Sequence, residues 1–280
     1  MKTDRSTILL VIIFLIGLSL LLYPSFANYW NSFTQSRAVA SYVEQLAEID
    51  DDRYREIWDA ARDYNDSLLT RENNYLLSDE QWEEYMELLN IGGNAVMGYV
   101  EVPKINISLP LYHGTDEAVL AVAIGHLEWT SLPVGGESTH CVVSGHRGLP
   151  SAKLFTDLDK VREGDIFLLH VLDETLTYEV DQIRIVLPHE TDELLIQEGK
   201  DLCTLVTCTP YGVNSHRLLV RGHRVDNIKE AQTVRVTADA FIIERLVVAP
   251  FVLLPILVIM ITFMLTTGKK ENRRRRRKRM

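Results

Sequence analysis

The apolar residues of the chain gather at its two ends. Residues 7–23 are apolar or small almost throughout, and residues 246–264 form a second run of 19 residues without a charged side chain. A helix needs roughly 20 such residues to cross a bilayer. Pro250 and Pro255 lie in the second run, but membrane helices tolerate proline where neighbouring groups satisfy the freed backbone. The pattern predicts transmembrane helices at 7–23 and 246–267.

The first apolar run has an alternative interpretation. Lys2 and Arg5 precede it, and a cleaved secretory signal also has a basic start and an apolar centre. No small residues in an A-x-A arrangement follow the run, which continues as PSFANYW. We therefore favour a retained anchor, with a cleaved signal as the alternative.

The charges predict how the chain is oriented and what it does not bind. The tail, residues 268–280, holds nine Lys or Arg against one Glu, and such clusters mark the cytoplasmic side of a membrane. Residues 1–6 are then cytoplasmic too, and residues 24–245 lie outside. That outer segment contains 18 Lys or Arg and 37 Asp or Glu, a formal charge of −19. Nucleic acid is therefore not an expected partner.

The pattern of apolar and polar residues in the outer segment changes near residue 95. Within residues 24–95, apolar positions recur every three or four residues from 36 to 69, which predicts an amphipathic helix. Ser78 and Gln81 can form a capping box for a second, short helix. These helices form an arm before the domain at residues 96–228, which a linker, 229–245, joins to the second anchor.

Residues 96–228 are expected to be mainly β. Short β-type runs alternate there with Gly, Pro, Asn and Asp, which favours a closed barrel or a sandwich. The predicted strands are 97–102, 105–111, 139–144, 165–172, 175–181, 183–187, 202–208 and 218–225, with short helices near 116–123 and 151–158.

The chain has an odd number of cysteines, Cys141, Cys203 and Cys208. An unpaired thiol outside the cell suggests a functional role. Cys203 and Cys208 are five residues apart in a predicted strand, so they point to opposite faces about 13 to 16 Å apart, which is too far for a disulfide.

Three residue types suited to acyl transfer occur at strand ends. A β-type run ends at Cys208, and the next begins near Arg217, which would bring the two onto adjacent antiparallel strands. A thiolate can attack an amide when an arginine stabilises the oxyanion and a histidine carries the proton. His146, between Gly145 and Gly148, is the preferred proton carrier. The other histidines lack the spacing of a zinc site.

Four stretches resemble the sortases, and most closely the class C, pilin-polymerising sortases. They are GYVEVPKINISLPLYHGT (98–115), GHLEWTSLPVGGESTHCVVSGHRG (125–148), AKLFTDLDKVREGD (152–165) and TLVTCTPYGVNSHRLLVRGHR (204–224). The resemblance implies an eight-stranded sortase β-barrel, with His146, Cys208 and Arg217 as catalytic residues.

The resemblance also implies a reaction without metal or organic cofactor. Cys208 would cleave an LPXTG-type sorting signal at its Thr carbonyl, and a pilin Lys amine would resolve the thioester on the outer face of a Gram-positive cell membrane. A housekeeping sortase that anchors proteins to peptidoglycan is one alternative. A non-catalytic membrane scaffold for pilus assembly is another.

One feature of class C sortases is missing from the sequence. Many carry a lid with an Asp-Pro-aromatic tripeptide before the barrel, and none occurs between residues 24 and 98. The nearest combination is Asp79 with Trp82, which is either a lid or a helix cap with a packing Trp.

Overall fold

The computed structural model describes residues 5–71 and 76–227, which fall into two units. Of the described residues, 5–29 belong to the first unit, and 30–71 and 76–227 to the second. The expected linker, second transmembrane helix and basic tail (229–245, 246–267 and 268–280) lie outside the described residues.

Helix α1 (Arg5–Leu46) begins in the first unit and contains Pro24. Among the described residues, the span Leu9–Leu46 is the one helix long and apolar enough to cross a membrane, with a window of mean hydropathy 2.5 that is not buried. An N-terminal signal sequence would pass the same test. The finding is consistent with the predicted anchor and with its cleaved alternative.

The predicted helix at 36–69 is divided in the structure. α1 ends at Leu46, and α2 (Asp51–Leu68) begins after Asp50, whose carboxylate accepts a 2.8 Å hydrogen bond from the Arg53 amide. A capping Asp with acidic residues in the next turn starts a new helix, which explains the break. α3 (Asp79–Glu87) has the predicted capping box between Ser78 and Gln81.

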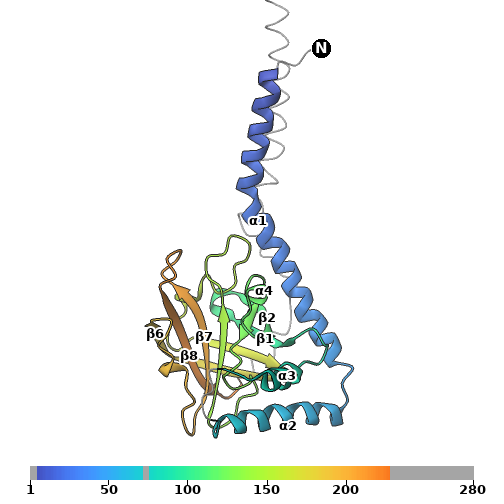
Figure 1. Cartoon of the computed structure of the whole chain (residues 1–280), viewed down its shortest axis with the longest axis vertical. Coiled ribbons are helices and arrows are strands. Elements are labelled where there is room, and N and C mark those ends of the chain that lie inside the picture. Colours follow the sequence, from blue (N-terminus) through green and yellow to red (C-terminus); the bar gives the residue numbers. More distant parts are fainter. Residues whose placement is uncertain (1–4, 72–75, 228–280) are drawn as a thin grey trace, which may run out of the picture. The chain divides into compact units, whose positions relative to one another are not determined.

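Eight strands form a closed barrel in the order β1-β2-β3-β4-β7-β8-β6-β5, with the helices outside it (Figure 1). The pairs β2·β3 and β4·β7 are parallel, and the other pairs are antiparallel. The strands are β1 (Val96–Val102), β2 (Ile107–His113), β3 (Ile124–His126), β4 (Thr139–Gly145), β5 (Ile166–Val171), β6 (Glu174–Val186), β7 (Asp201–Thr209) and β8 (His216–Val225). The mainly β prediction is confirmed, as a barrel and not a sandwich.

Two details of the strand prediction were wrong. The strands expected at 175–181 and 183–187 are one strand, β6, with a register shift between Val180 and Gln182. The bulge shifts the alternation of side chains between the two faces by one residue, so the two halves of the strand have the sequence patterns of separate strands. β3 was missed because three residues are too few for a period-two pattern.

Short helices complete the second unit. They are α4 (Glu117–Leu120) and the 3₁₀ turns η1 (Pro103–Ile105), η2 (Leu158–Lys160) and η3 (Asp192–Leu194). α4 falls within the helix expected at 116–123, whereas the helix expected at 151–158 is replaced by turns before η2.

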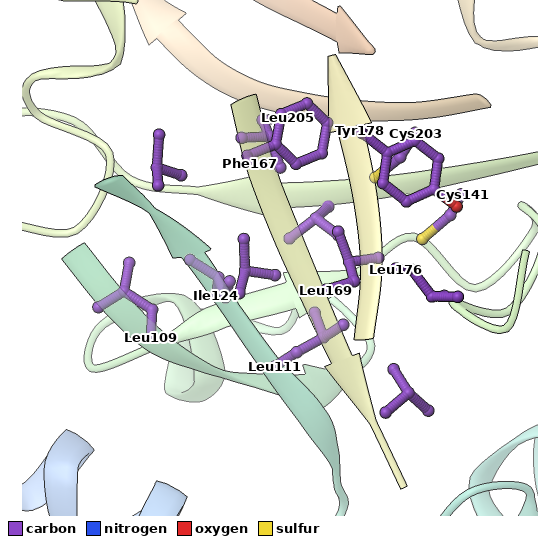
Figure 2. Close-up of a cluster of buried hydrophobic side chains, with 14 of the residues drawn as sticks. Leu109, Leu111, Ile124, Cys141, Phe167, Leu169, Leu176, Tyr178, Cys203 and Leu205 are labelled. Carbon is purple, nitrogen blue, oxygen red and sulfur yellow. The ribbon is translucent and has the colours of Figure 1, made fainter. Parts of the chain in front are cut away.

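The barrel interior holds the main core, shown in Figure 2. Cys141 and Cys203 are register partners on β4 and β7 and are 2% and 0% exposed. Tyr42 fastens α1 to the barrel, because its hydroxyl donates to the Met97 carbonyl at 3.1 Å and accepts from the Leu172 amide at 2.7 Å. Two of the three cysteines are therefore core residues, and Cys208 is half-buried outside the core.

Candidate active site

Cys208 and Arg217 lie opposite each other on neighbouring strands. They are register partners in the antiparallel pair β7·β8, six residues from the other end of the ladder at Leu202 and His223. Directly opposed side chains on one face of such a pair have Cβ atoms roughly 4.5 to 5.5 Å apart. The expected placement of these two residues on adjacent strands is what the structure contains.

His146 follows the end of β4, next to the end of β7. The parallel register of β4 and β7 runs from Thr139↔Asp201 to Ser144↔Val206. One residue further, the Thr207 hydroxyl donates a 2.7 Å hydrogen bond to the Gly145 carbonyl. His146 and Cys208 are the next residues on their chains, so the strand ends bring all three sequence-predicted site residues to one end of the barrel.

Gly145 is required where β4 leads into His146. A Cβ atom at this position would lie 2.7 Å from the Phe155 ring and 2.9 Å from Ile124. The Phe155 amide also donates a 3.1 Å hydrogen bond to the His146 carbonyl. Close packing around Gly145 therefore fixes the backbone that carries the imidazole.

Cys208 and Arg217 point away from the barrel interior. Leu205 and Leu218 belong to the main core, whereas Val206 and Leu219 belong to a separate cluster on the outer face. Side chains alternate along a strand, so Cys208 shares the face of Val206 and Arg217 that of Leu219. This outer cluster consists of Val142, Leu194, Val206 and Leu219, with Leu127, Trp129 and Val186 packed against it. Its four buried members are at most 7% exposed, so it is a covered apolar cluster that supports the strands beside the candidate site.

Cys208, His146 and Arg217 are each half-buried. Arg217 Nη1 donates to the carbonyls of Asn214 (3.3 Å) in the β7–β8 loop and of His216 (3.2 Å) at the start of β8. Both bonds use one nitrogen of a guanidinium that has five N–H donors. These two carbonyls therefore orient Arg217 and leave it capacity to bind a carbonyl oxygen.

A cavity of about 420 Å³ lies behind the candidate residues, on the inner side of the strands. Its walls include Arg147, Thr209 and Leu218, the residues that follow His146, Cys208 and Arg217. Arg147, with a side chain 9% exposed, donates to the Thr209 hydroxyl at 3.3 Å and pairs with Asp159. Arg147 thus links the His146 segment to the Cys208 segment, a contact that sequence spacing alone does not reveal.

The competing residues have other partners. Arg221 forms a two-bond ion pair with Asp181, both bonds 3.0 Å long, and is therefore a poorer electrophile than Arg217. His140 lies between the Leu195 carbonyl (2.9 Å) and the Thr204 hydroxyl (2.7 Å). Burial lowers the pKa of His140 to about 4. The described residues contain no group of three His, Cys, Asp or Glu side chains that could hold a metal ion.

Asp79 and Trp82 make the contacts expected of a helix start and a packing Trp, not of a lid. Asp79 is the first residue of α3, after the N-cap Ser78. The Trp82 ring packs against Tyr85, with centroids 5.6 Å apart, and against Gly114. These contacts are with the core and give a lid no support.

Comparisons with known proteins agree with the geometry. Residues 100–225 match the family model of the sortase domain. Over 131 residues the chain is 32% identical to Sortase D of Bacillus subtilis, a match that covers 46% of this chain. The chain spans 63% of the length of that curated relative.

Solved structures give longer matches. Sortase C1 of Streptococcus agalactiae is 52% identical, with a TM-score of 0.67, and the match covers 69% of this chain and all of the other. Sortase C of Clostridium perfringens, solved with the C-terminal cell wall sorting motif, is 45% identical, with a TM-score of 0.61 and the same coverage. The region from the arm to β8 is therefore similar to sortase C over its whole solved length.

Proposed function

Because the chain belongs to the sortase family, whose members are cysteine transpeptidases, we propose that it is a membrane-anchored transpeptidase with Cys208 as nucleophile. The observation that carries the proposal is the register pairing of Cys208 with Arg217, beside the strand end that leads into His146. A thiolate, a guanidinium that stabilises an oxyanion and an imidazole that carries a proton are the groups acyl transfer needs.

In the first half-reaction the Cys208 thiolate attacks the Thr carbonyl carbon of an LPXTG-type sorting signal. The Arg217 guanidinium stabilises the negative charge that develops on the carbonyl oxygen. His146 gives a proton to the departing Gly amine, so the Thr–Gly amide breaks and the acyl chain stays on Cys208 as a thioester. The sortase C of Clostridium perfringens, solved with the C-terminal cell wall sorting motif, supports this substrate class.

In the second half-reaction a Lys amine of a pilin subunit attacks the thioester. His146 takes the proton of the attacking amine, the carbon–sulfur bond breaks, and the product is an isopeptide amide. Cys208 returns to its starting state without any redox change. The likeness to sortase C1 favours a pilin Lys over a peptidoglycan amine as the acceptor.

The outer cluster supports the strand ends that carry the site. Val206 and Leu219 lie two residues from Cys208 and Arg217 on the same strand face, and they are 7% and 3% exposed. Their packing with Val142 and Leu194 holds together the strands that present the proposed nucleophile and electrophile.

The proposal is tested with the full chain in detergent micelles and a fluorogenic LPXTG-type peptide. We expect cleavage, and an acyl adduct on Cys208 that intact-mass spectrometry detects and hydroxylamine releases. Cys208→Ala should abolish both signals. Arg217→Lys should lower kcat/KM at least 100-fold, because a Lys ammonium lacks the planar fork of donors. A wild-type enzyme that never carries an acyl group on Cys208 would contradict the mechanism.

A second experiment separates the acceptors. The acyl-enzyme is offered a folded pilin domain or an amine that mimics the peptidoglycan precursor. We expect ligation to the pilin Lys, and ligation to the mimic alone would identify a housekeeping sortase. A non-catalytic scaffold predicts that cells with Cys208→Ala still polymerise pili.

The proposed location is the outer face of the membrane, with residues 1–6 and 268–280 in the cytoplasm. The apolar span in α1 and the nine cations of the tail support this topology. Protease added to intact protoplasts should therefore leave tags at both termini uncut.

A further inference from the structure

The part of α1 in the second unit attaches to the catalytic end of the barrel. Asn31 Nδ2 donates a 2.9 Å hydrogen bond to the carbonyl of Ser151, five residues after His146. One helical turn later, Gln35 Nε2 donates to the Val122 carbonyl at 2.6 Å. Tyr42, about 16 Å further along the helix than Asn31, reaches the β5–β6 hairpin at Leu172. The hairpin therefore marks the opposite end of the barrel.

Asn31 follows the apolar run of the chain closely. The run ends at Tyr23, eight residues before Asn31 in the sequence. Between them and just beyond lie aromatic residues, including Trp30 and Phe33, which are 59% and 46% exposed. Exposed aromatic residues after an apolar span are typical of the membrane–water interface.

The β7–β8 loop presents apolar side chains at this same end. Tyr211 and Val213, three and five residues after Cys208, are 62% and 68% exposed. The Tyr211 ring lies against Gly148, and the Arg147 guanidinium carbon is 6.0 Å from its centroid. Gly148 and Ser151 belong to one loop, so this loop joins Tyr211 to the Asn31 contact.

The charge of these segments differs from that of the outer domain. Residues 24–43, 145–156 and 209–217 contain no Asp or Glu, although the outer segment as a whole has a formal charge of −19. Their cations are Arg37, Arg147, Lys153 and Arg217.

The acidic residues that adjoin these segments are mostly paired. Asp157 pairs with Lys153 and Lys160, and Asp159 pairs with Arg147. Asp116 and Glu117 are the N-cap and the first residue of α4, on the side of the barrel where the Val122 carbonyl accepts from Gln35. Segments without acidic residues suit an anionic bilayer, which would repel the more acidic remainder of the domain.

We propose that the β7–β8 loop docks on the anionic lipid surface, with Tyr211 and Val213 in the interfacial layer. Trp30 and Phe33 continue this surface along α1. The inference rests on the membrane anchoring proposed above and adds the orientation of the catalytic end. Cys208 is then held close to the bilayer, which favours scissile bonds that lie near a membrane over those on freely diffusing peptides.

The test uses the full chain in nanodiscs that contain phosphatidylglycerol and a photoactivatable lipid with a diazirine near the headgroup. After illumination, mass spectrometry maps the cross-linked peptides. We expect cross-links within residues 8–33 and 209–214, and none in the β5–β6 hairpin. Val213→Asp should lower cross-linking of the loop at least fivefold without changing cross-linking of residues 8–33. The matched control Leu69→Asp, at a position 53% exposed beside α2, should change neither.

The outcomes separate this inference from the proposals it depends on. Cross-links in residues 8–33 without any in the loop would overturn the docking and keep the anchor. If neither residues 8–33 nor the loop are cross-linked, both the anchor and the docking are overturned. Unchanged loop cross-linking in Val213→Asp would also overturn the docking. Cleavage of a soluble LPXTG-type peptide by the same nanodiscs, which should be equal in Val213→Asp and wild type, reports on the proposed function independently.

Discussion

The Thr207 hydroxyl donates a 2.7 Å hydrogen bond to the Gly145 carbonyl, and this bond joins the residue before Cys208 to the residue before His146. Thr207 is 2% exposed and lies on the inner face of β7. We interpret Thr207 as a residue that positions the nucleophile relative to the imidazole.

Thr207→Val should lower kcat while leaving KM nearly unchanged. The substitution keeps the shape but leaves a buried carbonyl without this donor, at a cost of about 1 to 3 kcal/mol. Loosened strand ends let His146 and Cys208 separate, so we expect kcat to fall about tenfold in the peptide assay. Thr207→Ser, which retains the hydroxyl, is the control and should recover most of the rate. Equal kcat for wild type and Thr207→Val would refute this role.

Cys208 should be the one thiol of the three cysteines that reacts in the folded protein. Cys141 and Cys203 are buried in the core, and burial raises the pKa of the Cys203 thiol well above its usual range. Cys208 is half-buried on the outer face. Iodoacetamide should therefore add one label to the native chain, none to native Cys208→Ala, and three to the denatured wild type. Labelling of Cys141 or Cys203 at a comparable rate would contradict the burial argument.

Arg147→Lys should reduce activity although the charge is kept. The guanidinium bridges Thr209 and Asp159, and a Lys ammonium cannot hold both with the same planar geometry. We expect kcat to fall about tenfold, together with a shift in the pH profile of Cys208 alkylation as the imidazole moves relative to the thiol.

The matched control for Arg147 is Arg221→Lys. Arg221 also forms a two-bond contact, with Asp181, but away from the strand ends. Its replacement should change thermal stability by a similar amount and leave both kcat and the alkylation profile nearly as in wild type. If the two variants lose activity equally, the effect of Arg147 is a general loss of stability.

The sequence predicted the barrel and its catalytic end better than the contacts behind them. Cys208 and Arg217 could be assigned to adjacent strands because the two β-type runs flank one polar loop. The ion pair between Arg147 and Asp159 could not be predicted, because it depends on how the turns before η2 place Asp159 beside Arg147.

The errors in the secondary structure have similar causes. The bulge in β6 hid the continuity of a long strand, and the capping carboxylate of Asp50 divided the predicted helix into α1 and α2. In each case, a single residue changed the local periodicity on which the prediction depended.

The stability of the barrel should fall as the pH is lowered from about 6.5 to about 4. His140 is buried, with Nδ1–H donating to the Leu195 carbonyl and Nε2 accepting from the Thr204 hydroxyl, so the folded protein holds it neutral. Its pKa is about 4 when folded and about 6.5 when unfolded, so between these values the unfolded chain binds a proton that the folded chain excludes. The free energy of unfolding should drop by about 3 kcal/mol over this range. Burial lowers the pKa of His113 as well and adds to the loss of stability.

Urea titrations between pH 7.5 and 4.5 give the free energy of unfolding as a function of pH. This curve should be visibly flatter for His140→Gln than for wild type, whereas the exposed control His189→Gln should follow wild type. A curve of unchanged slope for His140→Gln would show that His140 is not the buried neutral group proposed here.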